Sequence, residues 1–265
     1  MKFFIVSLFP EMFENLFGLI QAARDKGKIK VDVLDLRQLG LGKHQKVDDQ
    51  VYGGSDGMLL SPEVLQLALE KVKSNPDFES AKVVVLSPKG KTWTQEMAQN
   101  WSQDPTPRIL ICGRYAGFDQ RFINKFCDEE VSIGDFILNG GEVAALAIIE
   151  TVARLSPEVL GNSVSAQEDS FSALDRPLLE APQFTRPNSW NNLDVPEILT
   201  SGHHELIDQW KRAASLTETY LKRPDLIWDE DRIELKNSLK NEVILKNINA
   251  LYDFNDNEKL MNWLE

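Results

Sequence analysis

The segment from residue 132 to residue 142, SIGDFILNGGE, has the residue types of a small-molecule binding loop. A carboxylate, Asp135, lies between Gly134 and the pair 140–141. The apolar triplet 136–138 could form one wall around a ligand. Glycines permit positive φ and close approach of the backbone, so main-chain amides and carbonyls can contact a ligand directly. A pair of ordinary β-turns would also explain the glycines, so this segment alone leaves both interpretations open.

Two further glycine-bearing loops favour the ligand interpretation. SPKGK at 87–91 follows an apolar run that ends at Leu86, and GRYAG at 113–117 follows one that ends at Cys112. Ligands of open α/β sheets bind at the carboxyl ends of the strands. Neither G-x-G-x-x-G nor G-x-x-x-x-G-K-[ST] occurs, so neither a dinucleotide fold nor a phosphate loop is supported. We expect a small ligand held mainly by backbone, such as an adenosine-containing molecule bound without phosphate contacts.

The elements that must position these loops follow from the apolar pattern. Short runs of apolar residues predict buried parallel strands, because they are too short for helices. These runs are Phe3–Leu8, Val31–Leu36, Lys82–Leu86 and Arg108–Cys112. Helices are predicted over Glu11–Arg24, from Pro62 with Ser61 as N-cap, over Gln95–Trp101 with Thr94 as cap, and over Glu142–Leu155. The alternation of strands and helices predicts an α/β domain with a parallel sheet.

The second half of the chain has a different character. Residues 156–189 are rich in proline and polar residues without sustained periodicity, which is typical of a linker and an extended loop. A helix is predicted over His203–Leu221, followed by a break at Pro224 and further helix from about Asp229. We therefore expect a first domain over 1–160, a linker over 161–175 and a small, mainly helical domain over 176–265.

Composition limits the classes of function. No run of 18 apolar residues occurs, and Pro10 ends the first apolar run too early for a signal peptide, so we expect a soluble cytoplasmic protein without a membrane partner. Cys112 and Cys127 have no metal-ligand spacing, which predicts core thiols and no metal site. A net charge of -12 argues mildly against nucleic acid as a partner. Local basic clusters, equally explained as solvated faces, are Lys43, His44, Lys46 and His203, His204, Lys211, Arg212, Lys222, Arg223.

Six motifs together resemble the bacterial tRNA (guanine-37-N1)-methyltransferases, the TrmD family of the SPOUT class. They are VDDQVYGGSDGM (47–58), LSPKG (86–90), CGRYAGFDQR (112–121), SIGDFILNGGE (132–142), EDSF (168–171) and TRP (185–187). The resemblance covers roughly residues 1–235. It implies a SPOUT-type parallel sheet with a deep trefoil knot whose loops hold S-adenosylmethionine. It also implies a homodimer with shared active sites, acting on the anticodon stem-loop of tRNA.

The resemblance also assigns the residues of the reaction. Asp169 would be the general base that removes the proton from guanine N1, and Arg154 would stabilise negative charge on O6. Because guanine N1 is protonated near pH 7, methyl transfer needs such a pair. From the residues alone, the ordinary interpretations are favoured: Asp169 as a cap in a polar loop and Arg154 as a charge at a helix C-terminus. Donor binding is implied for Leu86, Ser87, Pro88, Gly113, Tyr115, Ile133, Gly134, Asp135, Phe136, Ile137, Leu138, Gly140 and Gly141.

For the RNA substrate, the resemblance implies that Asp48, with Gly57 in the adjoining loop, reads the guanosine before the target base. An Asx-rich turn explains Asp48 equally well. Phosphates of the anticodon stem would be contacted by the basic cluster His203, His204, Lys211, Arg212, Lys222 and Arg223.

One departure from the family pattern bears on catalysis. The glutamate of the family's GRYEG motif is Ala116 here, which removes a carboxylate expected beside the methyl donor. Mg²⁺ is a candidate second cofactor, although a magnesium dependence that uses this carboxylate is not expected. The alternatives are a related RNA methyltransferase with an altered target, or a non-catalytic RNA-binding or S-adenosylmethionine-binding protein.

Overall fold

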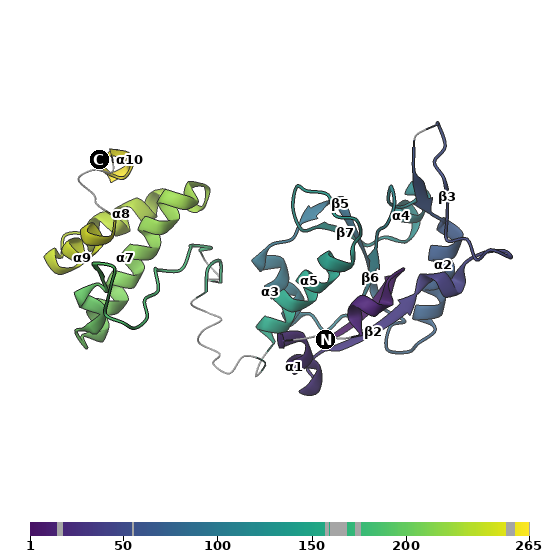
Figure 1. The fold of residues 1–265 in the computed structure, drawn as a ribbon, viewed down its shortest axis with the longest axis horizontal. Helices are drawn as coiled ribbons and strands as arrows, with labels where there is room; N and C mark the ends of the chain where they lie inside the picture. The colour runs from purple at the N-terminus through teal and green to yellow at the C-terminus, as the bar shows by residue number, and fades with distance from the viewer. Residues whose placement is uncertain are drawn as a thin grey trace. The chain divides into compact units, whose positions relative to one another are not determined.

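The computed structural model describes residues 1–14, 18–54, 56–156, 159, 169–172, 176–252 and 258–264. The chain divides into two compact units, Met1–Ser163 and Val164–Glu265 (Figure 1). The predicted linker over 161–175 lies outside the described residues except for 169–172. No helix among the described residues is long and apolar enough to cross a membrane.

The first unit is an α/β domain around a five-stranded parallel sheet with strand order β2-β1-β6-β5-β7. Its strands are β1 (Lys2–Ser7), β2 (Lys30–Asp35), β5 (Lys82–Thr92), β6 (Arg108–Cys112) and β7 (Glu129–Ser132). The four predicted strands and the parallel sheet are confirmed. Strand β7 was not predicted, because its sequence EEVS contains only one apolar residue.

Strand β5 corrects the expectation that the SPKGK loop begins where a strand ends. Leu86 and Lys91 both pair with Val131 of β7, so the strand resumes after an excursion of the chain over 87–90. A Cβ atom on Gly90 would collide with the backbone nitrogen of Val131. Glycine is therefore required where the excursion returns to the sheet.

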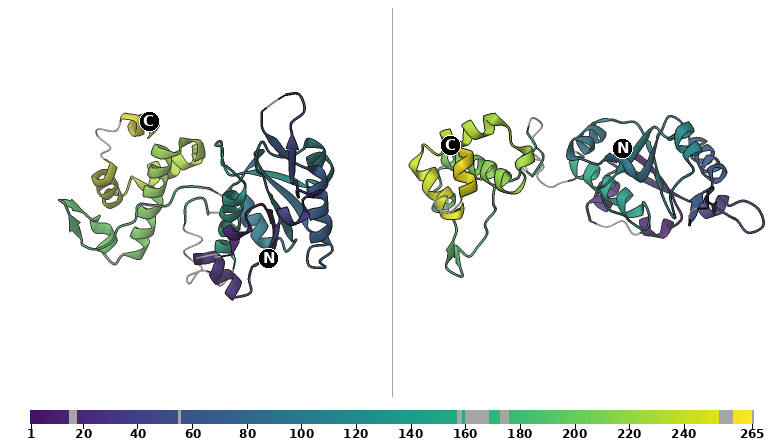
Figure 2. Two further views of the ribbon diagram at one scale, coloured as in Figure 1. Left: turned by 45° about the vertical axis from the view of Figure 1, so that its right-hand side comes forward. Right: turned by 90° about the horizontal axis from the view of Figure 1, so that it is seen from above.

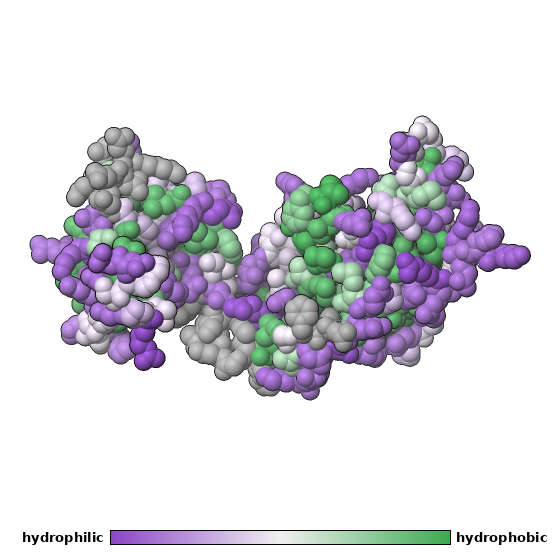
Figure 3. Space-filling view, in the orientation of Figure 1, coloured by the Kyte–Doolittle hydropathy of each residue, from purple (hydrophilic) through white to green (hydrophobic). Residues whose placement is uncertain are grey.

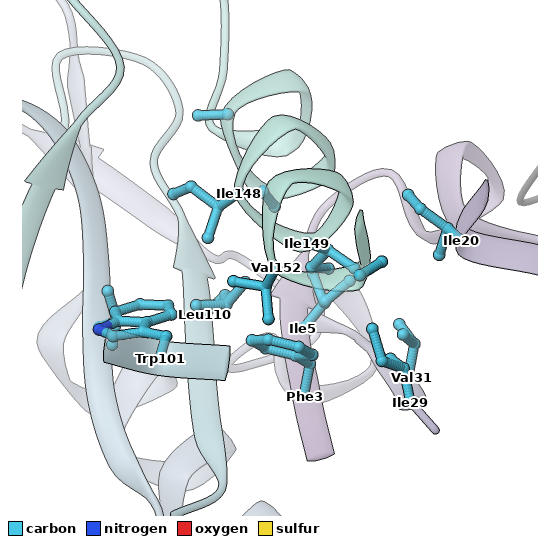
Figure 4. Packing of buried hydrophobic residues seen from close by; sticks show 14 of the residues in the cluster. Phe3, Ile5, Ile20, Ile29, Val31, Trp101, Leu110, Ile148, Ile149 and Val152 are labelled. Carbon is cyan, nitrogen blue, oxygen red and sulfur yellow. The ribbon is translucent and has the colours of Figure 1, made fainter. Parts of the chain in front are cut away.

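Helices cover both faces of this sheet (Figures 1 and 2). One face packs against α1 (Gly18–Asp25), α3 (Gln95–Gln103) and α5 (Glu142–Leu155). The other packs against α2 (Pro62–Lys73) and α4 (Gln120–Phe126). Helix α5 begins and ends as predicted, and Ile149 and Val152 point from it toward Ile5 and Phe3 of β1 (Figure 4).

The helix predicted over 11–24 is wrong in its first half. A 3-10 turn, η1 (Pro10–Phe13), precedes a separate α1 that begins at Gly18. Gly18 has φ +59°, a left-handed conformation that interrupts a right-handed helix. Residues 15–17, between these two elements, lie outside the part of the chain that the structure describes.

A short antiparallel hairpin lies beside the sheet, formed by β3 (Asp48–Gln50) and β4 (Met58–Leu60). The amide of Ala116 donates to the carbonyl of Met58 at 2.9 Å, and the amide of Leu60 donates to the carbonyl of Gly117 at 3.0 Å. The hairpin is thereby joined to the loop that follows β6.

The second unit is mainly helical. Its helices are α7 (His204–Lys222), α8 (Asp229–Ser238), α9 (Glu242–Tyr252) and α10 (Glu258–Leu264), with 3-10 turns η3 (Glu197–Thr200) and η4 (Pro224–Leu226). A two-residue hairpin joins β8 (Ser189–Trp190) to β9 (Leu193–Asp194). Trp210 is fully buried at the centre of the unit, and the rings of Tyr220 and Trp263 stack 4.0 Å apart. The helix predicted over 203–221 is confirmed within one residue at each end.

Candidate functional site

A cavity of about 550 Å³ lies at the carboxyl edge of the sheet. This volume is in the usual range for small-molecule sites. Three segments, 86–89, 113–118 and 132–141, supply most of its lining. Every predicted donor-binding residue except Asp135 lines it. The lining residues that were not predicted are Leu59, Lys89, Arg114, Ala116, Gly117, Phe118, Gln120, Ile123, Glu130, Ser132, Asn139 and Ala144.

Glycines bring two of these loops into backbone contact. The amide of Gly141 donates to the carbonyl of Gly113 at 2.9 Å, and Gly140 forms a bridge with Arg114. A Cβ atom on Gly141 would lie 2.8 Å from the Cα of Cys112. One on Gly140 would collide with the side chains of Arg114 and Glu142. The segment 132–142 therefore folds back onto the loop after β6 only because side chains are absent here.

A buried ion pair joins the same two loops. Nη2 of Arg114 lies 3.0 Å from Oε2 of Glu142, and the Glu142 side chain is only 1% exposed. Oε1 of Glu142 also accepts a hydrogen bond from Ser7 Oγ at 2.7 Å. The guanidinium of Arg114 lies over the ring of Phe9, 4.0 Å from its centroid, and Nη1 donates to the carbonyl of Asn139 at 3.3 Å. This network closes one side of the cavity.

Sequence reasoning missed Arg114, Glu142 and Ser7. The only sequence signals were an arginine directly after a strand and a glutamate directly after a glycine pair. Both have ordinary explanations, and only the fold brings the two residues together. The pair is a structural support of the cavity, because its charged atoms are occupied by each other.

The apolar wall of the cavity comes from the segment after β7. Ser132 Oγ accepts from the amide of Gly134 at 3.2 Å and donates to its carbonyl at 3.0 Å, and Gly134 has φ +149°. The ring of Phe136 lies where a Cβ atom of Gly134 would project. Phe136 and Ile137 are exposed and line the cavity, so they offer an apolar surface to a ligand.

Tyr115 links the cavity to the hairpin β3–β4. It has φ +59°, which is rare for a residue with a side chain, and it lines the cavity while remaining half exposed. Burial, and then the charge of its hydrogen-bond partner Asp48, raises the pKa of the Tyr115 hydroxyl. A Cβ atom on Gly57 would lie 3.5 Å from Cβ of Ala116. The predicted substrate residues Asp48 and Gly57 therefore lie beside the wall of this cavity.

A second cavity of about 340 Å³ lies within the helical unit. Asp169 lines it together with Lys211 and Arg212, so the structure brings the predicted base and two predicted phosphate-binding residues together. Arg154 is exposed in the last turn of α5 and belongs to the first unit.

Several of the predicted phosphate-binding cations contact carboxylates. Arg212 forms a two-point ion pair with Glu234 at 2.7 and 2.9 Å, which lowers the pKa of that carboxyl group. Other pairs on the same helical unit are Lys222 with Glu218 at 2.8 Å and Arg223 with Asp225 at 2.7 Å. Each pair keeps one partner partly exposed and is weak, so RNA phosphates can compete with these carboxylates.

The cysteines lie in the interior of the first unit. Cys112 is buried, which raises the pKa of its thiol, and Cys127 is half-buried and donates to the carbonyl of Glu129 at 3.0 Å. Among the residues that the structure describes, no three His, Cys, Asp or Glu side chains are grouped so as to hold a metal ion.

Comparison with known proteins identifies relatives of the whole first unit and part of the second. The family model described as tRNA (Guanine-1)-methyltransferase TrmD matches residues 1–229. The tRNA (guanine-N(1)-)-methyltransferase of Staphylococcus epidermidis is 43% identical over 229 residues, 86% of this chain and 91% of the relative. The proteins of the same name from Desulfitobacterium hafniense and Albidiferax ferrireducens are 45% and 42% identical, over 227 and 247 residues. These alignments cover 85% and 92% of this chain, and 84% and 98% of the relatives.

Proposed function

The chain belongs to the TrmD family of tRNA (guanine-N1)-methyltransferases, and from that premise we propose that it methylates N1 of guanosine 37 in tRNA with Asp169 as general base. Membership establishes an S-adenosylmethionine-dependent tRNA (guanine-N1)-methyltransferase. The target position and the roles of individual residues are the parts proposed here. Its tRNA substrate implies that the enzyme works in the cytoplasm.

S-adenosylmethionine supplies an electrophilic methyl group when it is bound. The 550 Å³ cavity supports binding of this donor, because it combines an apolar wall at Phe136 with main-chain groups from the glycine-bearing loops. Backbone amides and carbonyls of the segment 133–138 can recognise a purine edge without charged side chains.

Asp169 supports the proton-transfer step. It is half-buried, lines the second cavity, and belongs to a segment that is hydrogen-bonded to α7. A carboxylate held on a folded unit can accept the proton of guanine N1 as the methyl group arrives, and such a base is worth roughly 10²- to 10⁴-fold in rate. Arg154 would stabilise the charge that then develops on O6. The neighbouring cations Lys211 and Arg212 would bind the phosphates of the substrate.

We also propose the knot of the SPOUT class for the loops around the donor cavity. Strand β7 lies beside β5 on the side away from β6, yet the chain after β7 returns to Gly113, at the end of β6. It must cross the carboxyl end of β5 to do so. This path supports a threaded arrangement and explains the close contacts of Gly140 and Gly141.

A homodimer is proposed on separate grounds. Apolar side chains of Phe136, Ile137, Leu138 and Val143 are exposed along the last donor loop and the first turn of α5. Figure 3 shows apolar surface over the region of α5 and the loops above it. A contiguous apolar surface of this kind is typical of a subunit interface. A second copy of this chain would cover it and would border the donor cavity.

The alternative function rests on the alanine at position 116. The absent carboxylate would otherwise lie in the donor cavity, so a changed target or loss of catalysis is the second candidate, with donor and RNA binding retained. Mg²⁺ dependence would then require a different carboxylate, and Asp169 is the candidate that the reaction already needs.

The test is transfer of labelled methyl from S-adenosylmethionine to unmodified tRNA transcripts with G or A at position 37. We expect label only on the G37 transcript, and a loss of roughly 10²- to 10⁴-fold in Asp169→Ala. Glu197→Gln, which changes an exposed carboxylate of the same unit, is the matched control. Donor binding without label on either transcript would support the alternative. Full activity of Asp169→Ala would remove Asp169 from the mechanism.

A further inference from the structure

The strongest unassigned feature is a buried ion pair beside the second cavity. We propose that Asp231 on α8, acting through Arg176, positions the segment that carries Asp169 for proton transfer. This inference rests on the proposed role of Asp169 as base. Asp231 lies two positions beyond residue 229, where the match to the family model ends.

The partner on α8, Asp231, is held in place by two contacts. Nη1 of Arg176 contacts Oδ1 of Asp231, whose side chain is fully buried, and Oδ2 of Asp231 accepts from the amide of Trp228 at 2.8 Å. The guanidinium of Arg176 also lies over the ring of Trp228, 5.0 Å from its centroid. Separating Arg176 from Asp231 would leave a buried carboxylate without its cation, which costs much free energy, so the pair is held in this geometry.

Arg176 is connected to Asp169 by short hydrogen-bonded steps. The amide of Leu178 donates to the carbonyl of Arg176 at 2.9 Å, and the amide of Phe171 donates to the carbonyl of Leu178 at 2.9 Å. The amide of Ser172 in turn donates to the carbonyl of Asp169 at 3.1 Å. When the position of Arg176 is fixed, residues 169–172 are held as well, because the backbone hydrogen bond from Phe171 to Leu178 joins them to it.

The same segment is attached to α7 at two further points. The amide of Leu179 donates to Thr219 Oγ1 at 2.9 Å, and Ser215 Oγ donates to the carbonyl of Leu179 at 2.6 Å. The amide of Glu180 donates to Ser170 Oγ at 2.9 Å, next to Asp169. These contacts hold the middle of the segment, and the pair of Arg176 and Asp231 holds its other side against α8. The helical unit thus holds the segment that contains Asp169 in place.

A neighbouring pair provides the contrast. Arg212 of α7 lines the same cavity and pairs with Glu234 of α8, but both side chains are more than a third exposed. Exposed pairs contribute little to stability and can exchange partners. Asp231 is fully buried, and its carboxylate also accepts a hydrogen bond from the amide of Trp228. Of these two pairs, Arg176 with Asp231 is therefore the one that can act as a rigid support.

The test compares Arg176→Met with Arg176→Lys, with Asp231→Asn, and with the control Lys246→Met, which removes an exposed cation of the same unit. Methyl transfer to tRNA, binding of S-adenosylmethionine and amide hydrogen exchange at residues 171–172 are measured for each full-length protein. For Arg176→Met we expect kcat to fall on the order of 10- to 100-fold with donor affinity unchanged and faster exchange at 171–172. Arg176→Lys should retain part of the kcat that Arg176→Met loses, and the control Lys246→Met should have the kcat of the wild type.

A kcat within twofold of wild type in folded Arg176→Met would overturn the proposal. If that variant does not fold, Asp231→Asn decides in the same way, since it removes the charge of the carboxylate and keeps the volume of its side chain. Equal loss of donor affinity and kcat would also overturn it, because it would indicate general loss of structure. Wild-type rates in Asp169→Ala would instead refute the assignment of the base, and the exchange measurement would still report whether the pair anchors this segment.

Discussion

The guanidinium of Arg114 and the carboxylate of Glu142 lie 3.0 Å apart in the interior, and they join the loop after β6 to the first turn of α5. Residues of both segments line the cavity. Glycine contacts place their backbones, whereas the ion pair determines how firmly they stay together. The cavity therefore depends on a charged contact that no ligand needs to touch.

Replacing Glu142 by Ala should destabilise the first unit by about 3–5 kcal/mol, because it leaves the guanidinium of Arg114 without its buried carboxylate. Ser7 Oγ loses its acceptor at the same time. Urea unfolding measures the loss, and binding of S-adenosylmethionine to the folded protein should weaken in parallel. In the double variant Arg114→Met with Glu142→Met, which removes both charges, much of this stability should return.

The control for this experiment is Glu197→Ala, which removes the exposed carboxylate paired with Lys246 at 2.8 Å. It should change stability by less than about 1 kcal/mol. If Glu142→Ala cost no more than this control, the ion pair would not support the cavity.

Gly140→Ala tests the contact between the two donor loops. The added Cβ atom would collide with the side chains of Arg114 and Glu142, so their ion pair must shift or one loop must move, and donor affinity should fall about tenfold. Gly27→Ala is the control, because Gly27 has φ +66° but nothing lies within 4 Å of its added Cβ atom. It should cost roughly 1 kcal/mol of stability through backbone strain and leave donor affinity unchanged. Calorimetric titration with S-adenosylmethionine distinguishes the two, and equal affinity in both variants would contradict the prediction.

Much of the fold was predictable because its signals are local. Apolar runs such as Arg108–Cys112 are buried on both faces of the sheet, and the Thr94 side chain caps α3 by accepting from the amide of Met97. The predicted role of Ser61 was wrong in detail, since its side chain makes no cap hydrogen bond. Strand β7 was missed because an edge strand with polar residues lacks the apolar pattern on which the prediction depends.

The candidate site likewise has features that the sequence predicted and features that it did not. Glycine-bearing loops after buried strands were recognised from sequence, and the fold gathers them into one cavity. The pairs of Arg114 with Glu142 and of Arg176 with Asp231 were not predictable, since their partners are separated by 28 and 55 positions and have ordinary local explanations. Long-range charge pairing follows from topology, and no local pattern contains it.

The amino ends of β1 and β2 give a prediction on pH. Lys2 and Lys30 are neighbours in the sheet, and both contact the carboxylate of Asp77, at 2.7 and 2.9 Å. Hydrogen bonds from Lys2 and then Lys30 lower the pKa of Asp77 from 3.8 to about 2. A lowered pKa means that the stabilising contribution is present above pH 4 and is lost as pH falls through about 2.

Asp77→Asn should therefore be less stable than the wild type at pH 7 and low salt, because two adjacent ammonium groups lose their shared carboxylate. The difference should shrink between pH 4 and pH 2, and also in high salt, which screens exposed charges. Thermal unfolding of both proteins across this pH range measures it. A difference that stayed constant down to pH 2 would show that the charge of Asp77 is not its cause.

Ala116→Glu decides between a weakened and an altered enzyme. Residue 116 is exposed at the wall of the donor cavity and its amide is held by the carbonyl of Met58, so a longer side chain can extend without displacing the loop. If the reaction is guanosine-37 methylation, the new carboxylate should raise turnover on the G37 transcript and increase its response to added Mg²⁺. Ala116→Gln, which has nearly the same shape without the charge, is the matched control and should not raise turnover. Unchanged or lower turnover in Ala116→Glu would mean that the surrounding site no longer uses a carboxylate at this position, and the target base should then be sought among other nucleotides of tRNA.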